Sequence, residues 1–289
     1  GSATSGTVPA IETYKTIRKA NWGDIQNGLS ANYMLTEDID ASSGFAPVTG
    51  MFTGKFDGLF HTIKNMHVTA GGGLFKETSN AKIENIGVSN STIAGGSPAA
   101  PAGAIVGHAK DTTLRHVHSE HTTVTGNTFF AAALVGRTEG TNRIAYSYAD
   151  NADLSTAGTM IGTINGGTTY VDHSYIVGDF GNPGPASTTL WGFARGISGA
   201  TTKLYVQNSY FDASVATNRT IALASGASGN LVPGDTILIG EFGATASAST
   251  YTQGAIPPGG APGSPSIERE DIHRISLYDS ADPAKFGWG

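Results

Sequence analysis

A six-residue pattern recurs six times between residues 63 and 211, and every copy opens with a branched aliphatic side chain. The copies begin at Ile63, Ile83, Leu114, Ile144, Val171 and Val206. A single lap of the chain cannot bury its own apolar side chains, because nothing covers them from above or below. Stacked laps, about 4.8 Å apart, place each of them on its counterpart above and below. The pattern therefore predicts a solenoid with a continuous axial core.

Two further apolar series follow the same period. One precedes the last five copies and steps by 26 to 31 residues, with members at Gly73–Phe75, Ala104–Gly107, Ala133–Gly136, Thr159–Gly162 and Leu190–Phe193. The other comprises Ile93, Val124 and Leu154. Three short strands per lap predict an all-β chain folded as a single-stranded parallel β-helix of about seven coils, right-handed as parallel crossovers generally are.

The pattern also predicts where the stack begins and ends. Residues 1–31 contain what looks like a cloning scar at Gly1-Ser2 and a cap, with a short helix over 17–29. Residues 32–212 hold the repeats, which open with an alternating strand at 32–40. We expect residues 213–266 to form an irregular coil, loop or insertion, and residues 267–289 to form a cap or tail with helical spacing at 267–277. We expect a monomer that is an excised part of a larger chain.

Composition excludes several classes of partner. The 40 glycines and a charged share of 14% suit short strands joined by turns. A net charge of -6 with no basic cluster argues against nucleic acid and against anionic membrane surfaces. No stretch approaches the ~18 apolar residues of a membrane span, so we expect no membrane insertion by this fragment. The absence of cysteine excludes disulfides, thiolate metal sites and a cysteine nucleophile.

Two stretches near the start resemble a known family. They read Asn32-Tyr33-x-Leu35-x-x-Asp38-Ile39-Asp40 and Phe52-Thr53-Gly54-x-Phe56-Asp57-Gly58-x-x-His61-Thr62-Ile63-x-Asn65. Together with the Gly-rich repeats that follow, they make the chain similar to the GLUG-motif repeat proteins of bacterial and archaeal surface proteins, over roughly residues 32–211. The resemblance implies a β-helical stalk or passenger domain in adhesins and other secreted proteins, with no catalytic residues.

Two columns of the pattern carry side chains that could recognise a ligand. The fifth position holds rings at His67, His118, Tyr148, Tyr175 and Tyr210. The third holds Asn65, Asn85, His116, Tyr146, His173 and Asn208. Like residues stack in a parallel solenoid, so the rings should form a stripe and the amides a ladder. If the ring stripe faces solvent, it is a candidate platform for sugar rings; the alternative places the rings at a corner of the coil, where they stabilise it.

Other chemistry has weaker support. His116 and His118 share a strand face and could bind a metal with a third ligand, but their repeat columns already explain both, and we predict no metal site. The aspartates form no clear acid and base pair, so we predict no catalytic residue and no cofactor. Calcium held by loop aspartates is an open alternative.

The interpretation that unites these features is an extracellular bacterial adhesin-type binding module, secreted or at the cell surface and not an enzyme. Its lateral face or a loop would present a surface to a glycan or a host-surface protein. A polysaccharide lyase or glycosidase on the same scaffold, and a passive spacer of a larger surface protein, are the two alternatives, because fold does not decide function.

Overall fold

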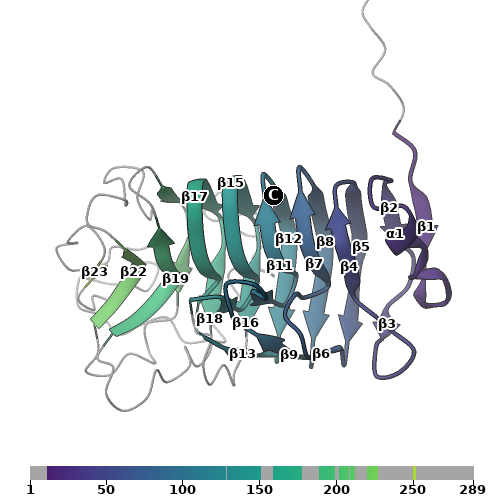
Figure 1. Cartoon of the computed structure of the whole chain (residues 1–289), viewed down its shortest axis with the longest axis horizontal. Helices are drawn as coiled ribbons and strands as arrows, with labels where there is room; N and C mark the ends of the chain where they lie inside the picture. The colour runs from purple at the N-terminus through teal and green to yellow at the C-terminus, as the bar shows by residue number, and fades with distance from the viewer. Residues whose placement is uncertain are drawn as a thin grey trace, which may run out of the picture.

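Parallel strands stack along the long axis of the molecule (Figure 1). The computed structural model describes residues 12–127, 129–150, 159–177, 189–198, 202–207, 209–211, 220–226 and 250–251. Among the named strands of these ranges every pairing is parallel except that of β22 with β23. The predicted all-β parallel solenoid is therefore confirmed, and its right-handedness stays a prediction.

Backbone pairing sorts the strands into four stacks. The first contains β4 (Val48–Phe52), β7 (Phe75–Ser79), β11 (Val106–Lys110), the start of β15 (Val135–Ala145), the start of β17 (Ile161–Asp172), β19 (Thr189–Ser198) and β22 (Thr220–Gly226). The second contains β1 (Lys15–Ile17), β2 (Tyr33–Leu35), the starts of β5 (Lys55–Lys64), β8 (Lys82–Ser89) and β12 (Thr113–Glu120), the ends of β15 and β17, and β20 (Lys203–Gln207).

The other two stacks complete each lap. The third contains β3 (Ile39–Asp40), the ends of β5, β8 and β12, β16 (Tyr148–Asp150), β18 (Tyr175–Val177) and β21 (Tyr210–Phe211). The fourth contains β6 (His67–Val68), β9 (Thr92–Gly95) and β13 (Thr123–Gly126). Beside them lie the pair β10 (Ala102–Gly103) and β14 (Ala131–Ala132) and the short β23 (Thr250–Tyr251).

The aliphatic column of the second stack is confirmed. Leu114 pairs with Ile83 on one side and Ile144 on the other, and the column continues through Val171 to Val206. All five side chains are buried. Burying each of these side chains stabilises the fold by about 1.5 to 3 kcal/mol. A single lap could not bury them without its neighbours. The pairing of Ile93 with Val124 confirms the third apolar series, whereas Leu154 lies outside the described residues.

The predicted register of the first copy is wrong. Phe56, not Ile63, pairs with Ile83, and Ile63 pairs with Ile39 and Val88 in the third stack. The error has a local cause, because an aliphatic residue two positions before an asparagine occurs at two places in the same lap. Ile83 precedes Asn85 at one corner and Val88 precedes Asn90 at the next.

The number of complete turns is also smaller than expected. Val48, Phe75, Val106, Val135 and Ile161 form one column of the first stack, with one lap between neighbours. These positions bound about four turns between β4 and β17, with β19 and β22 beyond them, and the predicted count of about seven is not supported.

Corner residues adopt a left-handed backbone conformation in three lines parallel to the axis. The lines contain Asn80 and Asp111; Asn85, His116, Tyr146 and His173; and Asn65, Asn90 and His121, with φ between 44° and 61°. Such a φ costs a non-glycine residue about 1 to 2 kcal/mol, and Asn, Asp and His tolerate it best. The polar third position of the sequence pattern is therefore a corner position, and Asn65 belongs to a different corner from Asn85.

A serine or threonine follows many of these corners and joins two coils. Ser147 donates its hydroxyl to the carbonyl of Ala145 at 2.8 Å and accepts the backbone N–H of Val117, in the preceding coil, at 3.2 Å. The same two bonds are made by Ser91, Thr122 and Ser174. Each bond contributes about 1 kcal/mol, so the pair offsets the cost of the corner before it.

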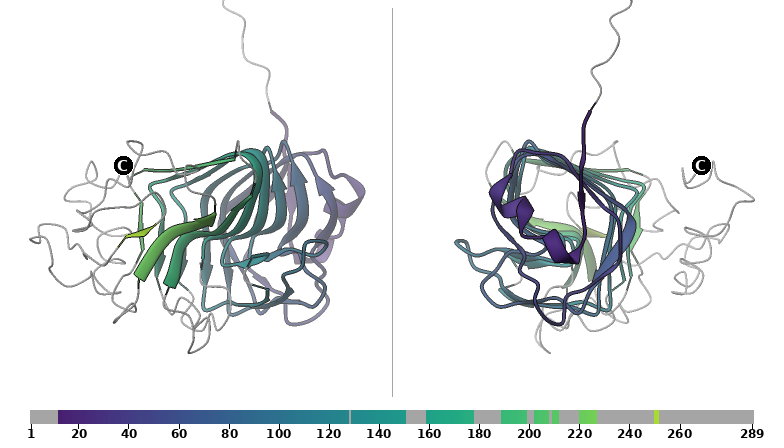
Figure 2. Two further views of the ribbon diagram at one scale, coloured as in Figure 1. Left: turned by 60° about the vertical axis from the view of Figure 1, so that its left-hand side comes forward. Right: turned by 90° about the vertical axis from the view of Figure 1, so that its right-hand side faces the viewer.

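Short helical turns lie across the N-terminal end of the solenoid (Figure 2, right). The predicted helix over 17–29 is confirmed only in part, as a 3-10 turn η1 (Lys19–Asn21) and a single turn α1 (Asp24–Asn27), while Ile17 ends β1. Trp22 and Ile25 are buried, and the Trp22 ring packs edge-on against Phe56 at 5.7 Å. These side chains cover the first aliphatic layer, as an end cap must.

Beyond β21 the structure describes little. Residues 220–226 continue the first stack as β22, within the segment for which the sequence predicted an irregular coil. The predicted C-terminal cap at 267–289 and the Asn208 position lie outside the described residues. Within the described ranges no helix has the length and apolar character needed to cross a membrane.

Candidate functional site

The predicted ring column forms a tight stack in the third stack of strands. His118 lies over Tyr148 with centroids 5.0 Å apart and planes 3° apart, and Tyr148 lies over Tyr175 at 4.9 Å and 5°. Tyr210 pairs with Tyr175 through the backbone, but its side chain lies outside the described residues. His67 does not belong to the column, because it pairs with Thr92 in the fourth stack and contacts the Thr92 hydroxyl.

This ring stack is a structural feature of the solenoid. Tyr148 is 8% exposed and Tyr175 1%, and the ring faces between them cover one another. Of the two alternatives that the sequence left open, the one in which these faces meet solvent does not hold for Tyr148 and Tyr175, and the one in which the rings stabilise the coil fits the geometry. Burial raises the pKa of Tyr148, whose hydroxyl donates to Glu120. The sequence could not decide between the alternatives because it does not show what lies over an outward position.

A strained bulge in β5 exposes two large apolar side chains. The register between β5 and β8 jumps from Asp57 to His61, so residues 58–60 face Asn85 alone. Leu59 and Phe60 both have a positive φ, 46° and 63°, and their exposed fractions are 44% and 73%. Two adjacent non-glycine residues in this conformation cost about 1 to 2 kcal/mol each, and burial does not compensate, because both side chains are exposed. Strain of this kind with exposed apolar surface indicates a binding position.

Phe60 is the first of four rings that line one corner of the solenoid. The Phe60 and His116 ring centroids are 6.1 Å apart, those of His116 and Tyr146 5.4 Å, and those of Tyr146 and His173 4.9 Å. The rings of the third pair are nearly parallel, with 11° between their planes, whereas the planes of the first and second pairs are tilted by 39° and 50°. We call these four residues the aromatic ridge. The left-handed corner turns His116, Tyr146 and His173 out of the strand surface in three successive coils, whereas the coil between Phe60 and His116 has Asn85 at this corner.

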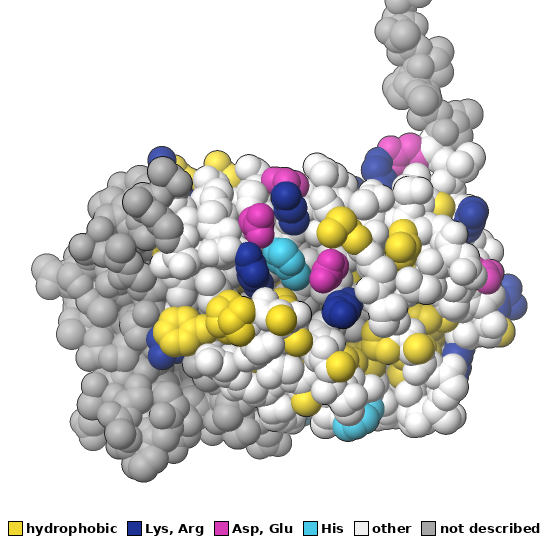
Figure 3. Space-filling view, in the orientation of Figure 1, with side chains coloured by type: hydrophobic (Ala, Val, Ile, Leu, Met, Phe, Trp, Pro, Cys, Tyr) yellow, Lys and Arg dark blue, Asp and Glu magenta, His cyan; other side chains and the backbone are white. Residues whose placement is uncertain are grey.

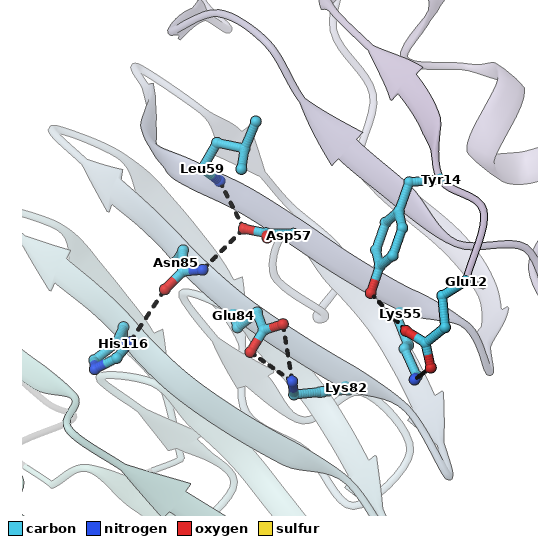
Figure 4. Close-up of polar contacts among 9 residues, drawn as sticks. All are labelled: Glu12, Tyr14, Lys55, Asp57, Leu59, Lys82, Glu84, Asn85 and His116. Atoms are coloured by element: carbon cyan, nitrogen blue, oxygen red, sulfur yellow. Dashed lines mark hydrogen bonds and ion pairs between the residues drawn. The ribbon is translucent and has the colours of Figure 1, made fainter. Parts of the chain in front are cut away.

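Hydrogen bonds fix the beginning of the aromatic ridge (Figure 4). Asp57 Oδ1 accepts the N–H of Leu59 and the side-chain amide of Asn85, both at 2.9 Å. Asn85 Oδ1 then faces Nδ1 of His116 at 3.1 Å, so this nitrogen carries the proton and donates. Burial and the nearby Arg115 lower the pKa of His116, which keeps the imidazole neutral near neutral pH. The bulge and the second ring are therefore held by one polar ladder.

Charged side chains flank the aromatic ridge on the second stack. The Lys82 ammonium lies 2.7 Å from a Glu84 oxygen, Lys55 pairs with Glu12, and the guanidinium of Arg143 lies 3.0 Å from Asp172. Asp172 also lies 2.7 Å from Nδ1 of His173, in a geometry that is not a hydrogen bond. The rings of Tyr170 and Tyr205, which pair on neighbouring second-stack strands, stack with their centroids 5.1 Å apart and extend the aromatic surface on that stack.

A different face of the solenoid carries mixed charge. Figure 3 shows acidic, basic and histidine side chains gathered over β7, β11 and β15. Here Glu139 lies 3.2 Å from Arg137 and 3.4 Å from His108, so opposite charges meet within the cluster. In the described part of the chain no three His, Cys, Asp or Glu side chains lie close enough together to hold a metal ion. His116 and His118, considered above as a metal pair, contact Asn85 and Tyr148 instead.

The aromatic ridge was missed in part by sequence reasoning. His116, Tyr146 and His173 were recognised as a column, but as the amide ladder rather than as a line of half-buried rings. Leu59 and Phe60 occupy the two positions that the family motif leaves open, so a motif comparison passes over them. A usable signal was present, because two large apolar residues after Asp57-Gly58 have no counterpart in the later copies.

No family model matches the chain. The chain is similar to halomucin of Haloquadratum walsbyi (strain DSM 16790 / HBSQ001), with 36% identity over 129 residues. This alignment covers 37% of the chain and only 1% of halomucin, so the chain spans a very small part of that relative's length.

Replacing Phe60 with glycine should leave the fold at least as stable as before. Glycine adopts a positive φ without strain, and this gain of about 1 to 2 kcal/mol exceeds the backbone entropy cost of about 0.4 to 1 kcal/mol. The free energy of unfolding, measured by urea denaturation, should therefore stay equal or rise by up to about 1 kcal/mol. Tyr170→Gly is the matched control, since Tyr170 is an exposed ring in an ordinary strand conformation, and it should destabilise the protein. Equal destabilisation by both variants would show that the bulge is not strained.

Stability should fall in mild acid because of His118. Burial lowers the pKa of this histidine, Glu120 opposes the shift, and the ring is stacked on Tyr148 and lies against Gly87. The unfolded chain thus binds the proton at a higher pH, so the free energy of unfolding is highest above about pH 7 and falls as the pH drops through about 6.5. His118→Phe should reduce this slope, whereas Ser43→Ala, at an exposed residue with no titratable side chain, should not. Identical slopes in wild type and His118→Phe, from urea midpoints across this range, would contradict the assignment.

Proposed function

We propose that the chain is a binding module of a secreted or cell-surface protein, and that its aromatic ridge binds a glycan. The observation that carries the proposal is the strained, 73% exposed Phe60 at the head of a line of rings. A sugar ring offers an apolar face that packs on an aromatic ring and hydroxyls that bond to the polar groups beside it. The aromatic ridge supplies both, with the ring of Phe60 next to the Asp57, Asn85 and His116 ladder.

The architecture supports presentation of an extended ligand. Of the five coils from Phe60 to His173, four contribute a ring to the aromatic ridge and the coil of β8 contributes Asn85, so a polymer lying parallel to the axis would meet an aromatic contact at most of its steps. The parallel stack is continuous from β1 to β20, and a stiff rod of this kind needs no rearrangement to bind, which lowers the entropic cost of association. Similarity to a small part of a far longer protein supports a role as one segment of a larger chain.

The adhesin-type role and the resemblance to GLUG-motif proteins belong to this proposal. In it, the glycan is a host or neighbouring cell-surface component, and the rod presents the ridge away from its attachment. A host protein, a carbohydrate-active enzyme and a passive spacer are the competing functions. No contact among the described residues favours one of these, so each enters as an outcome of the test.

A glycan array followed by calorimetry tests the proposal. Wild-type protein should bind at least one class of polysaccharide, and Phe60→Ala should weaken that binding about tenfold or more, as loss of a central aromatic contact does. Met51→Ala is the matched control, because Met51 is 49% exposed on β4 in the first stack, away from the ridge. It should leave affinity unchanged.

Three results would contradict the proposal. Absence of any glycan binding would favour the spacer or a protein partner. Equal losses in Phe60→Ala and Met51→Ala would move the site off the aromatic ridge. New reducing or unsaturated ends after incubation with the bound polysaccharide would instead identify an enzyme.

A further inference from the structure

We infer that the glycan bound by the aromatic ridge carries carboxylates, and that Arg115 is the residue that recognises them. This inference rests on the proposed function and specifies its ligand class. It begins from the cations on the second-stack segments of β5, β8, β12 and β15, which are Lys55, Lys82, Arg115 and Arg143. Three of them lie against a carboxylate of the chain: Lys55 against Glu12, Lys82 against Glu84, and Arg143 against Asp172.

Arg115 differs from the other three cations. It is exposed, and its contact is with the ring of Tyr146, 4.8 Å from the guanidinium carbon to the ring centroid. The backbone pairing of the strands explains why Arg115 contacts a ring instead of a carboxylate. The column neighbour on one side is Glu84, which Lys82 already neutralises at 2.7 Å, and the neighbour on the other side is Ala145, which has no charge to offer. In the coil after Ala145 the same column position holds Asp172, but Asp172 pairs with Arg143.

The contact with Tyr146 positions the charge without neutralising it. A cation over a ring face is attracted by the quadrupole of the ring, but the ring accepts no conventional hydrogen bond from the in-plane N–H groups. A guanidinium has five such donors in a fixed fork that matches a carboxylate in two-point fashion. The ring therefore orders the Arg115 fork at the ridge while leaving it able to bind an anion.

The surroundings favour an anion at this point on the ridge. His116, the residue after Arg115, has a pKa lowered by burial and by Arg115 itself, so the pair carries a single positive charge near neutral pH. Thr113 stands one outward position before Arg115 on β12 and adds a hydroxyl rather than a carboxylate. A sugar ring on Phe60 or beside Tyr146 would place a carboxylate substituent within reach of the fork, whereas a neutral sugar would leave it unused.

A pair of polymers with one backbone separates this inference from the proposed function. Hyaluronan carries a carboxylate on every second sugar, and its carboxyl-reduced form has a primary alcohol there instead. Wild-type protein should bind hyaluronan at least about tenfold more tightly than the reduced polymer, and the preference should shrink as salt is raised. Arg115→Gln should remove the preference and leave binding to the reduced polymer unchanged. Arg115→Lys, which keeps the charge and loses the fork, should retain only part of the preference.

Lys110→Gln is the matched control, because it removes one exposed positive charge from β11 in the first stack. It should keep the full preference. Equal wild-type affinity for the two polymers, or an unchanged preference in Arg115→Gln, would overturn the inference while the proposed function survives. Failure to bind either polymer, together with an empty neutral glycan array, would overturn both. Binding of poly-glutamate as tight as that of hyaluronan would overturn the glycan assignment in favour of an acidic protein partner.

Discussion

The solenoid depends on how the chain turns its corners. At a corner the backbone leaves one strand direction for another, and its N–H and C=O groups would lose their partners in the neighbouring coils. The residues at these corners adopt a left-handed conformation, and a serine or threonine that follows bonds both to its own coil and to the preceding one. About two hydrogen bonds of 1 kcal/mol each offset a strain of about 1 to 2 kcal/mol. With the corners satisfied, the aliphatic columns can stack without interruption.

The same constraint creates the candidate binding surface. A left-handed residue cannot direct its side chain into the core, so whatever stands at the corner is displayed in a line along the axis. Asn85, His116, Tyr146 and His173 occupy that line, and the bulge adds Phe60 at its head. Scaffold and surface are therefore separable, because every corner of this line has a positive φ, and the hydroxyls that join the coils come from the residues after Tyr146 and His173, not from the displayed side chains. The identity of the ring or amide is free to serve a ligand.

Sequence alone predicted the fold class and the column from Ile83 to Val206, since periodic apolar residues report directly on burial. It failed for Ile63, because the chain uses an aliphatic residue before asparagine at two corners in one lap, and only pairing distinguishes them. It also could not tell which rings are covered. Tyr148 and Tyr146 are two residues apart and both stack on neighbours, yet the first is buried and the second lies on the ridge. Leu59 and Phe60 escaped notice because strain is a property of φ, which no composition or period encodes.

Hydrogen exchange at the Val117 amide tests the corner account most directly. This N–H is donated to the hydroxyl of Ser147 in the next coil, so it should exchange as slowly as the amides of the adjoining strands. In Ser147→Ala it should exchange about tenfold faster or more, while Ser43→Ala, at an exposed serine outside the corners, leaves it unchanged. Rapid exchange of Val117 in the wild type, or the same slow rate in Ser147→Ala, would show that the serine corners do not hold the coils together.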